Sequence, residues 1–210
     1  MLKPFYFVFA FSMILLTLYL SVLSAQSTQT ETEMSSKKDQ APRSAASGTV
    51  VIDGGYKTDG VDMGRPVRLI AAALKVKPEV FREAFSNVRP ERGAGGPSPA
   101  LARENKSVLL KALGKHGVTN ERLDEVSDFY RYRPSRDELW KHSPAFVEAI
   151  VVNNEVTELK IIRPGFGYSS EPKISIVGYE YLNIKTTLRF TSDLKTNGSL
   201  ASVSIEKPAK

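Results

Sequence analysis

The feature that most limits what this chain can fold into is a change in the spacing of its apolar residues near Ser143. Before that residue, apolar side chains recur every three or four positions, as on one face of a helix. After it they alternate with polar side chains, as along a half-buried strand. Helices followed by strands are typical of an α+β fold. We therefore predict a small helical subdomain followed by a small antiparallel β module.

Four short helices are expected between residues 66 and 130. Prolines, capping side chains and glycines mark their ends, at Pro66, Pro78, Ser98, Pro99, Gly114, Gly117, Thr119 and Asn120. Each predicted helix has about 10 to 16 residues, which is too short to persist alone in water. The helices must therefore pack on one another or on a sheet.

The strands are expected on both sides of the helices. A short run, Gly48–Asp53, precedes them and is stopped by Gly54 and Gly55. Five more candidates follow the helices, at residues 145–152, 155–162, 173–177, 184–191 and 199–205. The pairs Asn153-Asn154 and Asn197-Gly198 predict tight hairpin turns between neighbouring strands.

The first 25 residues have the composition of a signal peptide. Lys3 is followed by an uncharged apolar run from Pro4 to Leu20, and small residues ending at Ala25 suit cleavage. Retention as a membrane anchor is the alternative, because the run is long enough to span a bilayer. Polar residues 26–47 read as a flexible linker. The remaining boundaries are predicted as a helical subdomain with a short N-terminal strand at 48–143, and a β module at 144–210.

Composition limits the classes of partner that this chain is expected to bind. The chain has no cysteine, so no disulfide can stabilise it after export. Its formal net charge is +6, and the charges are spread along the chain, which is typical of a solubility feature. Attraction to an anionic polymer is the alternative. We expect an anionic envelope polymer or a protein as partner, no specific nucleic acid, and no membrane contact once residues 1–25 are removed.

Common catalytic arrangements are missing from the sequence. There is no cysteine nucleophile, no Gly-x-Ser-x-Gly turn and no phosphate-binding loop. The two histidines, His116 and His142, do not form a metal-ligand pair. Asp53, Asp59 and Asp62 lie in a Gly-rich loop, where turn and capping roles explain them better than calcium. We predict no catalytic residue, no metal and no cofactor.

The densest group of aromatic and basic residues is the candidate ligand site. Arginine and aromatic rings together can stack on sugars or bases while pairing with anions. The candidate residues are Tyr130, Arg131, Tyr132, Arg133, Arg136 and Trp140. The alternative is a connector whose rings pack between the helices and the sheet, with the arginines lying over them.

A second motif, within residues 156–176, is a structural turn. Gly165 and Gly167 permit a tight reversal, and Pro172 precedes the next strand. Tyr168 is expected to lay its ring over the turn with its hydroxyl in water. The motif resembles a short Gly-x-Gly-Tyr-x-x-x-Pro β repeat of bacterial extracellular and phage tail-fibre-like proteins. The helical part is similar to uncharacterised exported proteins of planctomycete-type bacteria, a resemblance that implies no activity.

These observations predict an exported, non-catalytic protein that serves binding or assembly at the cell envelope. Its location would be periplasmic, cell-surface or secreted, and its ligand is open. The alternative is an envelope hydrolase acting on polysaccharide or peptidoglycan. Buried carboxylates that face one cleft would favour the hydrolase.

Overall fold

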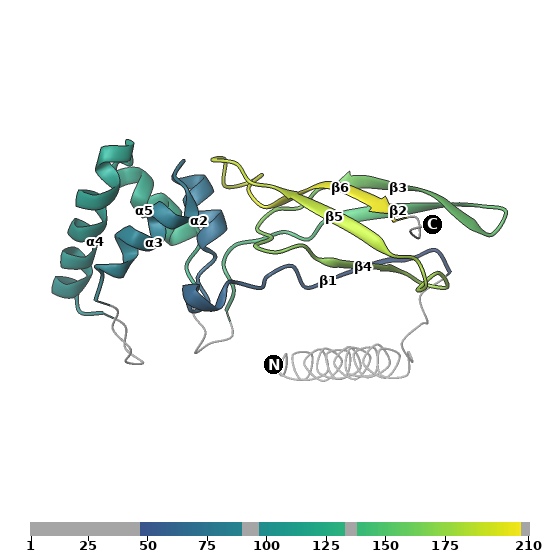
Figure 1. The fold of residues 1–210 in the computed structure, drawn as a ribbon, viewed down its shortest axis with the longest axis horizontal. Helices are drawn as coiled ribbons and strands as arrows, with labels where there is room; N and C mark the ends of the chain where they lie inside the picture. The colour runs from purple at the N-terminus through teal and green to yellow at the C-terminus, as the bar shows by residue number, and fades with distance from the viewer. Residues whose placement is uncertain (1–46, 90–96, 133–137, 207–210) are drawn as a thin grey trace, which may run out of the picture. The chain divides into compact units, whose positions relative to one another are not determined.

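The computed structural model describes residues 47–89, 97–132 and 138–206. Four α-helices lie in this part of the chain (Figure 1): α2 (Val67–Ala73), α3 (Pro78–Ser86), α4 (Pro99–Leu113) and α5 (Asn120–Phe129). Two single-turn 3₁₀ helices accompany them, η1 (Gly60–Asp62) and η2 (Gly114–His116). The predicted helices are confirmed, and with the strands below they make a small α+β fold.

Local capping explains where the helices begin. The Ser98 side chain accepts a hydrogen bond from the Leu101 N–H at 3.2 Å, which caps α4. Thr119 caps α5 in the same way, by accepting from the Arg122 N–H at 3.2 Å. Pro78 occupies the first turn of α3, where its missing N–H leaves no bond unmade.

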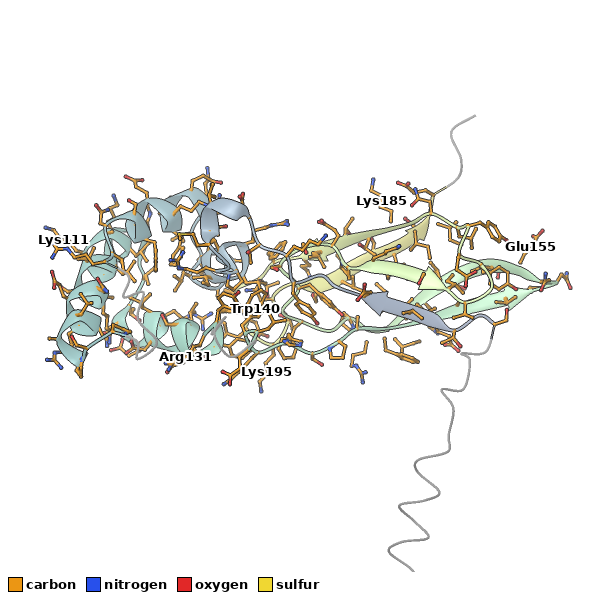
Figure 2. The ribbon with its side chains drawn as sticks, turned by 90° about the horizontal axis from the view of Figure 1, so that it is seen from below. Lys111, Arg131, Trp140, Glu155, Lys185 and Lys195 are labelled. Atoms are coloured by element: carbon orange, nitrogen blue, oxygen red, sulfur yellow. The ribbon has the colours of Figure 1, made fainter. Side chains whose placement is uncertain are left out.

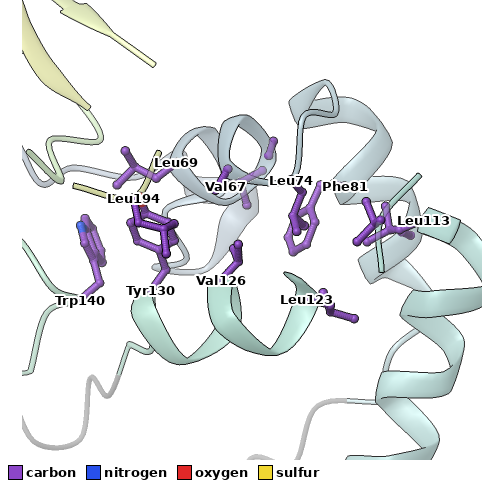
Figure 3. Close-up of a cluster of buried hydrophobic side chains, with 14 residues drawn as sticks. Val67, Leu69, Leu74, Phe81, Leu113, Leu123, Val126, Tyr130, Trp140 and Leu194 are labelled. Carbon is purple, nitrogen blue, oxygen red and sulfur yellow. The ribbon is translucent and has the colours of Figure 1, made fainter. Parts of the chain in front are cut away.

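The helices are held together by a shared apolar core (Figure 3). Leu69 of α2, Leu113 of α4 and Val126 of α5 are completely buried in it. Trp140 and Leu194, which lie outside the helices, belong to the same core. Helices this short depend on such burial, because propensity alone does not stabilise them.

Six strands form three two-stranded antiparallel ladders. They are β1 (Val50–Asp53), β2 (Phe146–Val152), β3 (Glu155–Arg163), β4 (Lys173–Ile176), β5 (Ile184–Arg189) and β6 (Ser199–Ile205). The ladders pair β1 with β4, β2 with β3, and β5 with β6. Asn153 and Asn154 join β2 to β3 with φ of 50° and 64°, so the predicted tight turn is confirmed there.

Strand β1 lies beside β4, although the four helices separate the two strands in sequence (Figure 1). Further strand contacts join β1 to β2, β3 to β6 and β4 to β5. Each ladder therefore neighbours both of the others, in the cyclic order β1, β2, β3, β6, β5, β4. A second apolar core, which includes Val147, Tyr168 and Leu200, lies among them. The strand that the sequence groups with the helices therefore contributes to the β part.

The tight turn predicted at Asn197-Gly198 is wrong. Arg189 of β5 is paired with Ser199 of β6, so a nine-residue connection, and not a two-residue turn, joins these strands. The Asn197 side chain is buried, and its amide N–H donates to the Leu69 carbonyl at 2.8 Å. The Asn-Gly pair therefore holds the β5–β6 connection against α2.

The predicted signal segment and nearly all of the predicted linker lie outside the described residues. Within the described ranges, no helix is long and apolar enough to cross a membrane.

Candidate functional site

Arg131 and Trp140, two residues of the predicted ligand site, lie where the helical part of the chain meets the β strands (Figure 2). Tyr130 and Trp140 are only 3% and 2% exposed. The Trp140 indole N–H donates to the Gly167 carbonyl at 2.8 Å, and the Tyr130 hydroxyl accepts from the Asn197 amide at 2.8 Å. Both rings connect the helices to the β part, and neither has surface left for stacking on a sugar or base.

Tyr132 is also packed against the protein. A Cβ added at Gly64 would lie 2.4 Å from Cε1 of Tyr132, so this ring covers the backbone of the loop that precedes α2. Its centroid is 6.3 Å from that of the Trp140 ring. The three rings of the predicted site are therefore held by packing on distant segments.

Of the three arginines of the predicted site, the structure describes only Arg131. Arg131 is exposed, but its guanidinium forms an ion pair with Asp128, three residues earlier. Arg133 and Arg136 lie outside the described residues.

Further rings extend this packing into the β part. Tyr56 stacks on Tyr168 with centroids 5.4 Å apart and lies 4.6 Å from the His142 ring. Burial raises the pKa of Tyr56 and of Tyr130 to about 12, so both hydroxyls stay neutral at physiological pH. We call Tyr56, Tyr130, Tyr132, Trp140 and Tyr168 the aromatic joint.

The Gly-Phe-Gly-Tyr turn lies against the aromatic joint. Gly165 and Gly167 have φ of 64° and 86°, a region that favours glycine. Phe166 exchanges two backbone hydrogen bonds of 3.0 Å with Ser143, and the Gly167 N–H donates to the Asn197 carbonyl at 2.8 Å. The turn therefore has the reversed backbone that its glycines predict.

Tyr168 differs from its prediction. The residue is buried, and its hydroxyl accepts a hydrogen bond from the Ala145 N–H at 2.8 Å. The expectation that this hydroxyl stays in water is wrong, because a backbone donor takes the place of water. Pro172 lies immediately before β4, as expected.

The histidines are not gathered at a reaction centre. Both His116 and His142 are exposed. The Nδ1 atom of His142 lies 2.8 Å from the Trp140 carbonyl, and its ring packs on Tyr56. Nowhere in residues 47–89, 97–132 and 138–206 do three or more His, Cys, Asp or Glu side chains gather as a metal site would require.

A cavity of about 470 Å³ lies beside α5 and mixes three acids with three bases. Its charged lining residues are Arg122, Glu125, Asp128, Lys141, Asp193 and Lys195. All three acids are exposed, and two of them pair with arginines near them in sequence. A glycosidase acid needs a pKa raised by burial, and Asp62 is the one buried acid of the described residues. This cavity does not favour the hydrolase.

Asp62 belongs to a second cavity, of about 350 Å³, between η1 and α3. Its carboxylate accepts two hydrogen bonds of 2.8 Å from the Arg82 guanidinium. The carboxylate therefore raises the pKa of Arg82. The cavity walls are mainly apolar and include Val61, Met63, Val67, Phe81, Phe85 and Val88. We call this cavity the η1 groove.

The η1 turn holds two large apolar side chains in solvent beside the groove. Asp59 caps the turn by accepting from the Val61 N–H at 3.2 Å, and Asp62 anchors it through Arg82. Met63 follows with a left-handed φ of 51°. Val61 and Met63 are nonetheless 72% and 66% exposed. Apolar side chains that are exposed together at an apolar groove favour contact with another molecule.

Arg65 supplies a charged rim to the η1 groove. Its guanidinium lies 4.1 Å from the centroid of the Phe85 ring and donates to the Asp62 carbonyl at 2.8 Å. It forms no direct ion pair with a carboxylate of the described chain. Burial lowers its pKa, but the group stays charged at neutral pH. The groove therefore combines apolar walls with two arginines, of which Arg82 is paired with Asp62 and Arg65 has no ion pair in the described residues.

Sequence reasoning overlooked this groove. It assigned turn and capping roles to the loop aspartates, which is right for Asp59 but incomplete for Asp62, whose partner is 20 residues away. A usable signal was present in residues 60–64, which read Gly-Val-Asp-Met-Gly. Large apolar residues between glycines in a short loop have few neighbours that could cover them.

Comparisons of this chain with protein families, with curated proteins and with solved structures found no match.

Proposed function

We propose that this protein is an exported, non-catalytic binding protein of the cell envelope, and that its partner is a protein segment docking in the η1 groove. Export is supported by Lys3, the apolar run that follows it, and the small residues ending at Ala25. The proposed binding role rests on the exposure of Val61 and Met63 on an anchored turn beside apolar walls.

We infer the chemistry of the partner from the lining of the groove. An apolar side chain would fill the space beside Phe81 and Phe85 and remove Val61 and Met63 from water. A carboxylate next to it would meet the Arg65 guanidinium. The preferred partner is therefore a peptide segment with a large apolar residue beside an acidic one.

A displayed peptide library selected on the purified mature protein tests this proposal. We expect the selected peptides to share an apolar residue beside Asp or Glu, and synthetic versions to bind. Val61→Ser with Met63→Ser should weaken their binding by at least about tenfold, because apolar contact area is lost. Arg65→Gln should reduce the preference for the acidic residue.

Tyr181→Ser is the matched control, because Tyr181 is a large exposed side chain outside the groove. It should leave peptide binding unchanged, and thermal melts should show that every variant is folded. Selection without an apolar-acidic pattern would refute the proposal, as would peptides that bind the variant with both serines as well as they bind the unmodified protein.

Export has its own test. The intact mass of protein recovered from the envelope or the medium should correspond to a chain beginning at Gln26. A species that still begins at Met1 would show that the N-terminal segment is retained as an anchor.

A further inference from the structure

The β2–β3 hairpin turns one face toward the β core and the other toward solvent. The inner face consists of cross-strand pairs of apolar residues, Val147 with Ile161 and Ala149 with Leu159. The outer face of β2 carries Phe146, Glu148, Ile150 and Val152. Phe146 and Val152 of this face are about half exposed, as is Ile162 of β3. Apolar surface of this kind on a sheet face favours contact with another molecule.

Two bulges place the charges of β3 on this outer face. In the register of the hairpin, Thr157 and Ile162 have no partner on β2, so each adds a residue to β3 and shifts its alternation. As a result Glu155, paired with Val152, shares a face with Glu158, paired with Ile150. All four charged residues of β3 are exposed: Glu155, Glu158, Lys160 and Arg163.

These four charges follow one another in the order acid, acid, base, base. None of the four forms an ion pair with another described residue. Glu148 on β2 adds one more acid, opposite Lys160. The outer face therefore carries three acids and two bases and has no excess positive charge with which to hold a polyanion.

The charge order of β3 is complementary to its own reverse. If a second β3 runs antiparallel across a two-fold axis at Leu159, Glu158 meets Lys160 of the second copy, and Glu155 meets its Arg163. The same axis passes through Ala149 of β2 and brings Phe146 against Val152 of the second copy. One symmetry operation thus pairs the four charges of β3 and brings exposed apolar side chains together, and it sets Glu148 against Ile150 of the second copy.

We infer that the outer face of the β2–β3 hairpin is a self-association surface, and that its partner is a second copy of this chain. The two hairpins stack face to face with their β3 strands antiparallel. This surface is separate from the η1 groove, so the inference does not depend on the proposed peptide binding. It gives the assembly role predicted from the sequence a specific form, which is a dimer of this chain.

The size of the surface sets the strength of the dimer. Stable interfaces use about 20 to 30 residues on each side. The outer face of one hairpin offers far fewer than that, so we expect a weak dimer that forms as the protein is concentrated. Sedimentation velocity over concentrations from micromolar to millimolar measures this directly.

Charge exchange tests the proposed geometry. Glu158→Lys places two lysines opposite each other at both symmetric positions, and Lys160→Glu does the same with two glutamates. Each single variant should raise the dissociation constant by about tenfold or more. The double variant Glu158→Lys/Lys160→Glu restores both pairs in reverse and should associate like the unmodified protein.

An equimolar mixture of the Glu158→Lys and Lys160→Glu proteins is the sharpest arm of the experiment. The lysine introduced into one chain then meets the glutamate introduced into the other, and the native Glu158 and Lys160 form the second pair. The mixture should therefore form heterodimers although neither variant associates alone. Lys173→Glu on β4 is the control for added negative charge, and Val61→Ser is the control for the η1 groove. Both should leave association unchanged.

All of the changed β3 side chains are exposed, and circular dichroism should show that the variants are folded. A protein that stays monomeric at every concentration would overturn the inference. So would single variants that associate as well as the unmodified protein, or a mixture that fails to recover.

Discussion

The aromatic joint and the η1 turn show how far residue type and surface role can diverge. The joint includes the three rings of the predicted ligand site, yet Tyr130 and Trp140 are buried and bonded to Asn197 and Gly167. The η1 turn has the residues of an ordinary loop, yet it exposes Val61 and Met63. In both regions the neighbours that determine exposure are distant in sequence. Local composition therefore indicates what a side chain can bind, but not whether solvent or a ligand can reach it.

The largest difference between the two regions is expected in the free energy of unfolding when one large apolar side chain is truncated in each. Trp140→Ala removes a buried ring and a hydrogen bond, and we expect it to lower the free energy of unfolding by about 3–5 kcal/mol. Met63→Ser should change it by no more than about 0.5 kcal/mol, because Met63 is mostly in solvent. Urea unfolding followed by circular dichroism measures both, and equal effects would remove the distinction between the regions.

Two glycines test how closely the Gly-Phe-Gly-Tyr turn packs against its neighbours. Gly54 has φ of 68° with open space where a Cβ would be, so Gly54→Ala should cost only the left-handed conformation, about 1–2 kcal/mol. Gly167 has φ of 86°, and its Cβ would lie 2.7 Å from the Cβ of His142. Gly167→Ala should therefore cost about 1–3 kcal/mol more, through overpacking.

Thermal melts of these two alanine variants give the comparison. If Gly167→Ala were no worse than Gly54→Ala, the turn would not be packed against His142 as described.

The elements of the fold were predictable where the signals are local. Ser98 and Thr119 cap helices through side chains that reach three residues along the chain, and Asn153-Asn154 closes a hairpin within two residues. A residue's preference for a cap or a positive φ can be read directly from its chemistry.

The arrangement of those elements was not predictable in the same way. The Asn197-Gly198 pair has the composition of a hairpin turn, but Asn197 bonds to Leu69, which is 128 residues away. Tyr168 loses contact with water because Ala145, 23 residues earlier, supplies a backbone donor. The η1 groove depends likewise on Arg82, which no local pattern links to Asp62.

A smaller effect is expected from the ionisation of the joint tyrosines. The pKa of Tyr130 is raised by burial from 10.0 to about 12 in the folded chain. Below pH 10 the hydroxyl is protonated in both states, and above it the unfolded chain loses the proton first. Stability should therefore fall as pH rises from about 10 to about 12. Tyr56 acts in the same direction.

Urea unfolding at a series of pH values between about 9 and 12 tests this dependence. Tyr130→Phe should reduce the loss of stability with pH, whereas Tyr181→Phe, at an exposed position, should not. Equal slopes in all three proteins would show that Tyr130 titrates as freely as an exposed tyrosine.

Hydroxyl-radical footprinting with mass spectrometry tests the central claim most directly, because one experiment reads both regions. The labelling of each residue in the folded protein is divided by its labelling in urea, which removes differences in intrinsic reactivity. The account predicts a ratio close to one for Val61 and Met63 and a ratio close to zero for Tyr130 and Trp140. Strong protection of Met63 together with free labelling of Trp140 would contradict it.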